Sequence, residues 1–213
     1  MKKYTQEDFD SIQRDAYGYK YLPEGDWTAV DFHSEDKLAF AGDCELGDYC
    51  KLGNYCELGN GCELGNRCEL GNWCKLGDGC ELGNYCELGN CCELGNYCEL
   101  GNCCELGDYC KLGDCCKLGN CCKLGDYCTM ENGRIHNATY FFVSNIGSEN
   151  RTAYAYCDRD SGEVFIRAGC WFSGIEDFIQ RVQDVHQGTQ HETDYLAFAA
   201  FAKARFAQYQ KGD

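Results

Sequence analysis

The stretch CELGNYCELGNCCELGNYCELGNCCELGDYC, residues 80–110, decides how this chain folds, because it repeats the same chemistry every six residues. The repeat extends in both directions, with cysteine at every sixth position from Cys44 to Cys128 and leucine two places after nearly every one. A helix cannot use this period, since successive units would rotate around its axis. A short strand followed by a sharp corner can use it, so the period predicts a solenoid.

Alternation within each unit predicts which side chains face inward. In an extended segment, residues two apart point to the same side, so Cys and Leu share one face and the Glu or Lys between them points away. Gly followed by Asn or Asp is expected to form each corner, because these residues tolerate positive φ. Three units close one coil, and stacked coils pair as parallel strands about 4.8 Å apart. The predicted interior ladder includes Cys50, Cys68, Cys86, Cys104, Cys122, Leu52, Leu70, Leu88 and Leu106.

The unit Leu46-Gly47-Asp48-Tyr49-Cys50-Lys51 resembles, position by position, the repeat of the hexapeptide-repeat family of left-handed parallel β-helices. The left hand is what this resemblance implies; the period alone does not give it. The predicted fold is mainly β: an N-terminal cap over residues 1–37, a left-handed β-helix over 38–132 and a small α+β domain over 133–213. No insertion breaks the repeat units.

The repeated cysteines are interpreted as packing residues, because a thiol is small, apolar and commonly buried. The alternative is a channel of stacked thiolates that binds a metal, but metal sites use a few ligands at irregular spacing. We therefore expect no metal and no cofactor. Disulfides are a third alternative, and Cys103 and Cys121, one coil apart, are the pair expected to react with an oxidant.

Columns of residues 18 apart predict the outer surface. An exposed aromatic column is the predicted interaction surface, with simple corner packing as the alternative. Its residues are Tyr55, Trp73, Tyr109 and Tyr127, with Cys91 between them. Of the predicted charge columns, Glu57, Lys75, Glu93 and Lys111 alternate in sign, while Glu45, Glu63, Glu81 and Glu99 carry like charges. An amide column of Asn66, Asn84, Asn102 and Asn120 is expected at a corner.

Both ends of the repeat need caps, because an open β-helix exposes sheet edges. The first 37 residues are expected to cap one end with a short helix near residues 6–15. After the repeat, three strands are predicted at 139–143, 152–156 and 163–167. Ser173 and Glu176 have capping-box spacing before a predicted helix. A last helix is predicted to present one aromatic face for self-association, composed of Tyr195, Phe198, Phe206 and Tyr209.

Charge and hydropathy narrow the classes of partner. The 213-residue chain has a net charge of −16, which argues against binding nucleic acid or an anionic membrane. Its first residues have no apolar segment typical of a signal peptide, and no long apolar run predicts a membrane span. We expect a cytoplasmic protein with reduced thiols.

A second resemblance covers nearly the whole chain. Glu24-Gly25-Asp26-Trp27, Ile146-Gly147-Ser148 and the run from Ala168 to Gly174 are similar to segments of proteins predicted in phages and prophages of gut bacteria. Those proteins combine a cysteine-hexad solenoid with this tail. The resemblance implies a viral context in a bacterial host and no established activity.

The expected function is non-catalytic: an acidic rod that serves as a scaffold or binds protein, joined into a homo-oligomer through the C-terminal domain, with a host protein as a further partner. Hexapeptide acyltransferases, by that resemblance, use a histidine base beside a loop excursion, whereas His33, His136, His186 and His191 all lie outside the repeats. Cys170 and His186 could be proposed as a nucleophile and its base, but we favour the interpretation that they are a buried thiol and a surface imidazole. Nucleic-acid mimicry, acyl transfer and thiol-based metal binding remain alternatives.

Overall fold

The computed structural model describes residues 1–119, 121–130, 135, 138–147, 151–169 and 171–209. The chain forms two compact units, Met1–Arg134 and Ile135–Asp213, each with its own core. The boundary between the units lies two residues beyond the one predicted from the sequence. Among the described residues, no helix combines the length and apolar character needed to cross a bilayer.

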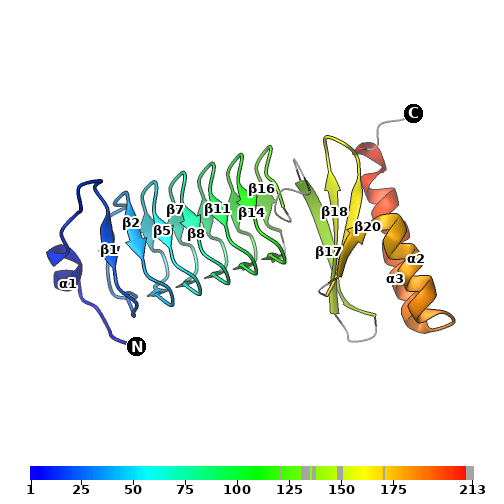
Figure 1. The fold of residues 1–213 in the computed structure, drawn as a ribbon, viewed down its shortest axis with the longest axis horizontal. Coiled ribbons are helices and arrows are strands. Elements are labelled where there is room, and N and C mark those ends of the chain that lie inside the picture. The colour runs from blue at the N-terminus through cyan, green and yellow to red at the C-terminus, as the bar shows by residue number, and fades with distance from the viewer. Residues whose placement is uncertain (120, 131–134, 136–137, 148–150, 170, 210–213) are drawn as a thin grey trace. The chain divides into compact units, whose positions relative to one another are not determined.

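The first unit is a left-handed parallel β-solenoid of about six turns, with three sheets along its sides (Figure 1). Residues 18 apart are paired throughout; Glu87 lies opposite Glu105, and Leu88 opposite Leu106. One sheet contains β1 (Lys20–Leu22), β2 (Leu38–Phe40), β5 (Glu57–Leu58), β8 (Lys75–Leu76), β11 (Glu93–Leu94) and β14 (Lys111–Leu112). The second contains β4 (Lys51–Leu52), β7 (Glu69–Leu70), β10 (Glu87–Leu88), β13 (Glu105–Leu106) and β16 (Lys123–Leu124). The third contains β3 (Glu45–Leu46), β6 (Glu63–Leu64), β9 (Glu81–Leu82), β12 (Glu99–Leu100) and β15 (Lys117–Leu118).

Cysteine and leucine fill the interior of the solenoid. The predicted ladder residues are buried, except Cys122, which is partly exposed near the last coil. Most of these thiols also have a polar partner: the Cys68 Sγ donates to the carbonyl oxygen of Gly47 on the preceding coil at 3.3 Å. The same contact recurs between Cys104 and Gly83 at 3.2 Å. Cysteine is therefore both small enough for the corner and able to donate a hydrogen bond there.

The corners differ from the prediction in which residue takes positive φ. The left-handed residue is the one after Asn or Asp: φ is 59° at Tyr49 and 62° at Trp73. The preceding glycine has another role, because a Cβ on Gly71 would lie 2.6 Å from the carbonyl carbon of Gly53 one coil earlier. Close stacking of coils, and not φ, therefore requires these glycines.

Amide side chains tie successive corners together. The Oδ1 of Asn66 accepts hydrogen bonds from the backbone N–H of Asn84 at 2.8 Å and from its Nδ2 at 3.1 Å. The Asn84 side chain repeats this contact with Asn102. The predicted amide column is confirmed over these three residues, and Asn120 lies outside the described residues.

The N-terminal cap is shorter than predicted, because β1 already pairs in parallel with β2 and adds a strand to the solenoid. The cap contains one helix, α1 (Gln6–Ser11), which ends before the predicted residue 15. Thr5 and Asp8 form a capping box at its start. Phe9 of this helix and Trp27 are fully buried, and both rings contact Phe32.

The second unit contains a four-stranded antiparallel sheet in the order β17 (Ala138–Ile146), β18 (Arg151–Asp158), β19 (Val164–Ala168) and β20 (Trp171–Gly174). Sequence reasoning missed β20 and assigned Ser173 to a helix cap. Ser173 instead pairs with Ile166 in the sheet, and Gly174 is the N-cap residue of α2 without a side-chain cap. The strand continues directly into the helix, which leaves Ser173 no room to cap it.

Helices α2 (Ile175–His186) and α3 (Gln190–Phe206) pack against one face of this sheet, and a short 3-10 turn, η1 (Ala207–Tyr209), follows (Figure 1). The prediction that this aromatic face of α3 is exposed for self-association is wrong. Tyr195, Phe198 and Phe206 are only 6%, 5% and 2% exposed, in a core that includes Ile166 and Phe178. The sheet of the same chain covers this face. Tyr209 is partly buried against that core.

Candidate interaction surface

Each corner of the solenoid places one left-handed residue per coil toward solvent, and all of these residues except Gly61 and Gly79 present a side chain there. In the predicted aromatic column φ lies between 58° and 62°, so all side chains leave the backbone in the same direction. The four aromatic residues are about half exposed: Tyr55 48%, Trp73 53%, Tyr109 56% and Tyr127 54%. The structure therefore brings the predicted aromatic residues together in one solvent-facing column.

Neighbouring side chains in these columns stack. The Tyr109 and Tyr127 rings are 5.0 Å apart between centroids and only 14° from parallel. On a second corner, the Arg67 guanidinium lies 5.6 Å from the ring centroids of both Tyr49 and Tyr85. Arg67 also donates to the Tyr49 hydroxyl at 3.2 Å. This contact was not predicted, although the column spacing of 18 residues contained the signal.

The flat sides carry charge in the predicted register. Lys111 pairs with Glu93 at 2.8 Å, and Lys51 pairs with Glu69 at 2.7 Å. The hydrogen bond from Lys111 lowers the pKa of Glu93 below its usual value. By contrast, Glu63 has Glu45 on one side and Glu81 on the other. The three sides are therefore electrostatically different.

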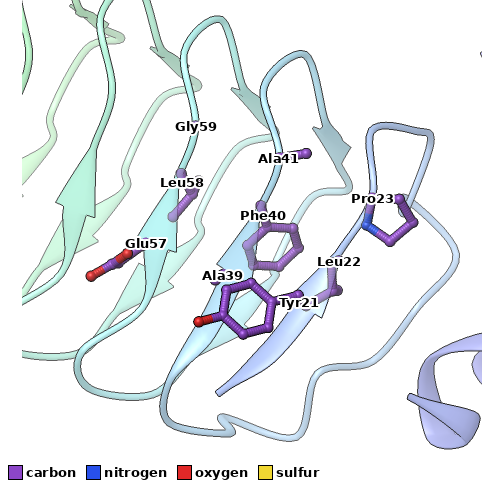
Figure 2. A pocket seen from close by; sticks show the side chains of 9 residues that line it. All are labelled: Tyr21, Leu22, Pro23, Ala39, Phe40, Ala41, Glu57, Leu58 and Gly59. Atoms are coloured by element: carbon purple, nitrogen blue, oxygen red, sulfur yellow. The ribbon is translucent and has the colours of Figure 1, made fainter. Parts of the chain in front are cut away.

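An apolar hollow interrupts one side near the N-terminal end. Tyr21, Ala39 and Glu57 lie opposite one another on β1, β2 and β5. Ala39 occupies the position that carries Glu or Lys in the later units, so the strip between the Tyr21 ring and Glu57 stays open (Figure 2). Pro23 and Ala41 line the same hollow. Sequence reasoning missed it, and alanine at an outward position was the available signal.

The cysteines divide into two classes. Most interior thiols lie against a backbone carbonyl of the preceding coil, as Cys86 does at Gly65 and Cys104 at Gly83, and they are shielded from solvent. Cys103 is partly exposed and Cys121 is exposed, and both thiols are free. Among the described residues, no group of three or more His, Cys, Asp or Glu gathers as a metal site.

The described histidines lie away from the repeat units. His33 is on a turn of the N-terminal cap, 3.3 Å from Asp31. His186 and His191 lie in the C-terminal unit with ring centroids 6.0 Å apart. His136 and Cys170 are outside the described residues. No described histidine lies on the coils from Cys44 to Met130.

Comparison with known proteins supports the repeat and gives little beyond it. The family described as bacterial transferase hexapeptide (six repeats) matches residues 74–108. This solenoid is built from hexapeptide repeats. The match covers part of the hexapeptide solenoid and none of the C-terminal unit. No curated protein and no solved structure matched the chain.

Proposed function

We propose that the chain is a non-catalytic scaffold that binds a protein partner through the aromatic column of the hexapeptide solenoid. The observation that carries this proposal is the alignment of four half-exposed aromatic side chains on one corner. Tyr and Trp are enriched at the centres of protein interfaces, where they bury much area at small entropic cost. A rigid backbone fixes their spacing before a partner arrives, which lowers the ordering cost further.

The charged sides argue against a partner that covers the whole rod. Lys117 pairs with Glu99 and Lys123 with Glu105, and burying such pairs in an interface would be costly. The corner column avoids this cost, because its residues project from turns between the charged strands. A bound protein would therefore contact an edge of the solenoid.

Affinity capture from a bacterial lysate with quantitative mass spectrometry tests the proposal. The column variant carries serine in place of each aromatic residue of the column, namely Tyr55, Trp73, Tyr109 and Tyr127. The column variant should capture about tenfold less of any partner that the unmodified chain retains, since hot-spot residues dominate binding energy.

A matched variant controls for general loss of aromatic surface. It carries serine at three tyrosines that are equally exposed on the other two corners, namely Tyr49, Tyr85 and Tyr97. Capture should survive this change. Equal losses in both variants, or equal retention, would show that the column is not the binding surface.

Acyl transfer is the second candidate function, and the transferase description of the matched family favours it. A general base must lie within reach of the acceptor proton. The described coils from Cys44 to Met130 contain no histidine to serve as that base. Turnover of acetyl-CoA with an amine acceptor, abolished by replacing one of the four histidines, would put acyl transfer in first place.

Self-association through the C-terminal unit remains part of the proposal, on different residues from those predicted. Val185 on α2 and Phe201 on α3 are 59% and 56% exposed. Light scattering of the full chain and of Phe201→Glu tests this surface. A lower oligomeric order in the variant supports self-association through this surface. An unchanged order would show that the chain self-associates through another surface. A phage-encoded protein in the cytoplasm of a bacterial host is the proposed setting, based on the sequence resemblance and on the free thiols of the interior cysteines.

A further inference from the structure

Two cysteines lie on the same corner of the hexapeptide solenoid, one coil apart. Cys103 and Cys121 share the left-handed conformation, with φ of 59° at each. The strands that follow pair Glu105 with Lys123, so the cysteines occupy equivalent positions on successive coils. Both thiols are free, and both are accessible from solvent to some degree.

The spacing of the coils sets how far apart such side chains lie, because neighbouring parallel strands are about 4.8 Å apart. Tyr109 and Tyr127 are related in the same way, and their nearly parallel rings are 5.0 Å apart. The Cβ atoms of a disulfide are only about 3.5–4.5 Å apart. Two thiolates that share one cation need sulfur atoms about 4.6 Å apart, twice a metal–sulfur distance of about 2.3 Å. The coil spacing therefore suits a shared cation better than a sulfur–sulfur bond.

We propose that Cys103 and Cys121 form a two-coordinate site for a soft monovalent cation, Cu(I). Thiolate ligands select soft cations, and Cu(I) is stable between two of them. A structural zinc ion would require four ligands. The described part of the chain offers no group of three or more ligating side chains, so this pair stands without further ligands.

The bound state is charged, and the two sulfur atoms lie at a corner that is open to solvent. Binding releases both thiol protons, and the Cu(I) dithiolate carries a net charge of −1. Lys123, two residues after Cys121, forms an ion pair with Glu105. Glu105, two residues after Cys103, offsets that positive charge, so solvent at the exposed corner stabilises the single negative charge of the dithiolate.

Competition with a coloured Cu(I) chelator tests the site on the reduced, full-length protein without oxygen. The unmodified chain should withdraw one Cu(I) per chain from the chelator. Cys103→Ser and Cys121→Ser should each weaken that binding by about 100-fold, because the second thiolate acts at a high effective concentration. X-ray absorption of the loaded protein should show two sulfur neighbours.

Two further single variants provide the control. Cys91 and Cys115 are also corner residues, each with φ of 60°. Their column neighbours one coil earlier are Trp73 and Tyr97, so neither has an in-register thiol there. Cys91→Ser and Cys115→Ser should withdraw copper like the unmodified chain.

Three outcomes would overturn the proposal. The unmodified chain could fail to compete with the chelator. Either control variant could lose as much affinity as Cys103→Ser. The double variant lacking Cys103 and Cys121 could still withdraw one Cu(I), which would assign the binding to other thiols. Circular dichroism of every variant confirms that each remains folded before the comparison is made.

Discussion

The solenoid and the C-terminal unit bury their apolar side chains by opposite means. In the solenoid, most interior residues pack against the same residue type 18 positions away, as Leu88 does against Leu70 and Leu106. In the C-terminal unit, Ile166 on a strand, Phe178 on α2 and Phe198 on α3 meet in one core. Local pattern therefore specifies the first unit, whereas the second depends on how distant segments pack.

The largest effect should come from the core of the C-terminal unit. Phe198→Ala removes a ring that is 5% exposed and should cost about 3–5 kcal/mol. Hydrogen exchange by mass spectrometry should show lost protection in peptides from Ile135–Asp213 and unchanged protection in Met1–Arg134. Phe201→Ala, on the exposed side of the same helix, should cost less than about 1 kcal/mol. Loss of protection in both units alike would mean that they unfold as one.

Replacing a glycine should have the next largest effect on stability, and the cost should differ between the two units. Gly101→Ala would place a Cβ 2.6 Å from the carbonyl carbon of Gly83, and this clash with backbone should cost about 3 kcal/mol. Gly188 in the C-terminal unit has φ of +73° and open space around it, so Gly188→Ala should cost only about 1–2 kcal/mol.

Gly79 is the control within the solenoid itself. It has φ of +67°, and a Cβ added there would meet nothing within 4 Å, so Gly79→Ala should resemble Gly188→Ala. The denaturant midpoints of the three glycine variants measure these costs. If Gly101→Ala proves no more costly than Gly79→Ala, close stacking of the coils is not what requires glycine.

The solenoid could be predicted well from the sequence because each six-residue unit contains the whole pattern that determines its conformation. Cys and Leu are two apart in every repeat, so strand geometry alone places both inside. The error at the corners has a local cause: Gly, Asn and Asp are the usual left-handed residues. Here Tyr49 and Trp73 take that conformation because the coil fixes the turn, and the Asn side chain is used to bond the next corner.

The C-terminal unit was predicted less well because its pattern has two valid interpretations. The aromatic face of α3 was identified as apolar, yet no feature of the sequence says whether a sheet or a second chain covers it. Tyr195 and Phe206 contact the chain's own core. Ser173 likewise was predicted to start a helix, and only its pairing with Ile166 makes it part of a strand.

Replacing an interior thiol should have a smaller effect than replacing Gly101. Cys86→Ala removes a buried sulfur and its hydrogen bond to the Gly65 carbonyl at 3.3 Å, at a cost of about 1–2 kcal/mol. Cys86→Ser should cost less, because a hydroxyl can donate to the same oxygen. Thermal unfolding of the two variants tests this order. A serine variant less stable than the alanine variant would show that the apolar character of the thiol, and not its hydrogen-bond donation, explains the cysteine.

The smallest effect should come from the charged sides, and its sign is opposite to the others. Glu63 lies between Glu45 and Glu81, so Glu63→Lys replaces two repulsive neighbours with two attractive ones. Exposed pairs contribute about 0.2–1 kcal/mol, so the variant should be more stable by about that amount.

Lys75 provides the mirror image of this change, because it lies between Glu57 and Glu93. Lys75→Glu creates a column of like charges and should destabilise the solenoid by a similar amount. Urea denaturation at low and high salt measures both variants, and salt should shrink both effects because it screens exposed charges. A loss of stability in Glu63→Lys at low salt would mean that the glutamate column is favourable as it stands, and that some cation or basic partner offsets its charge.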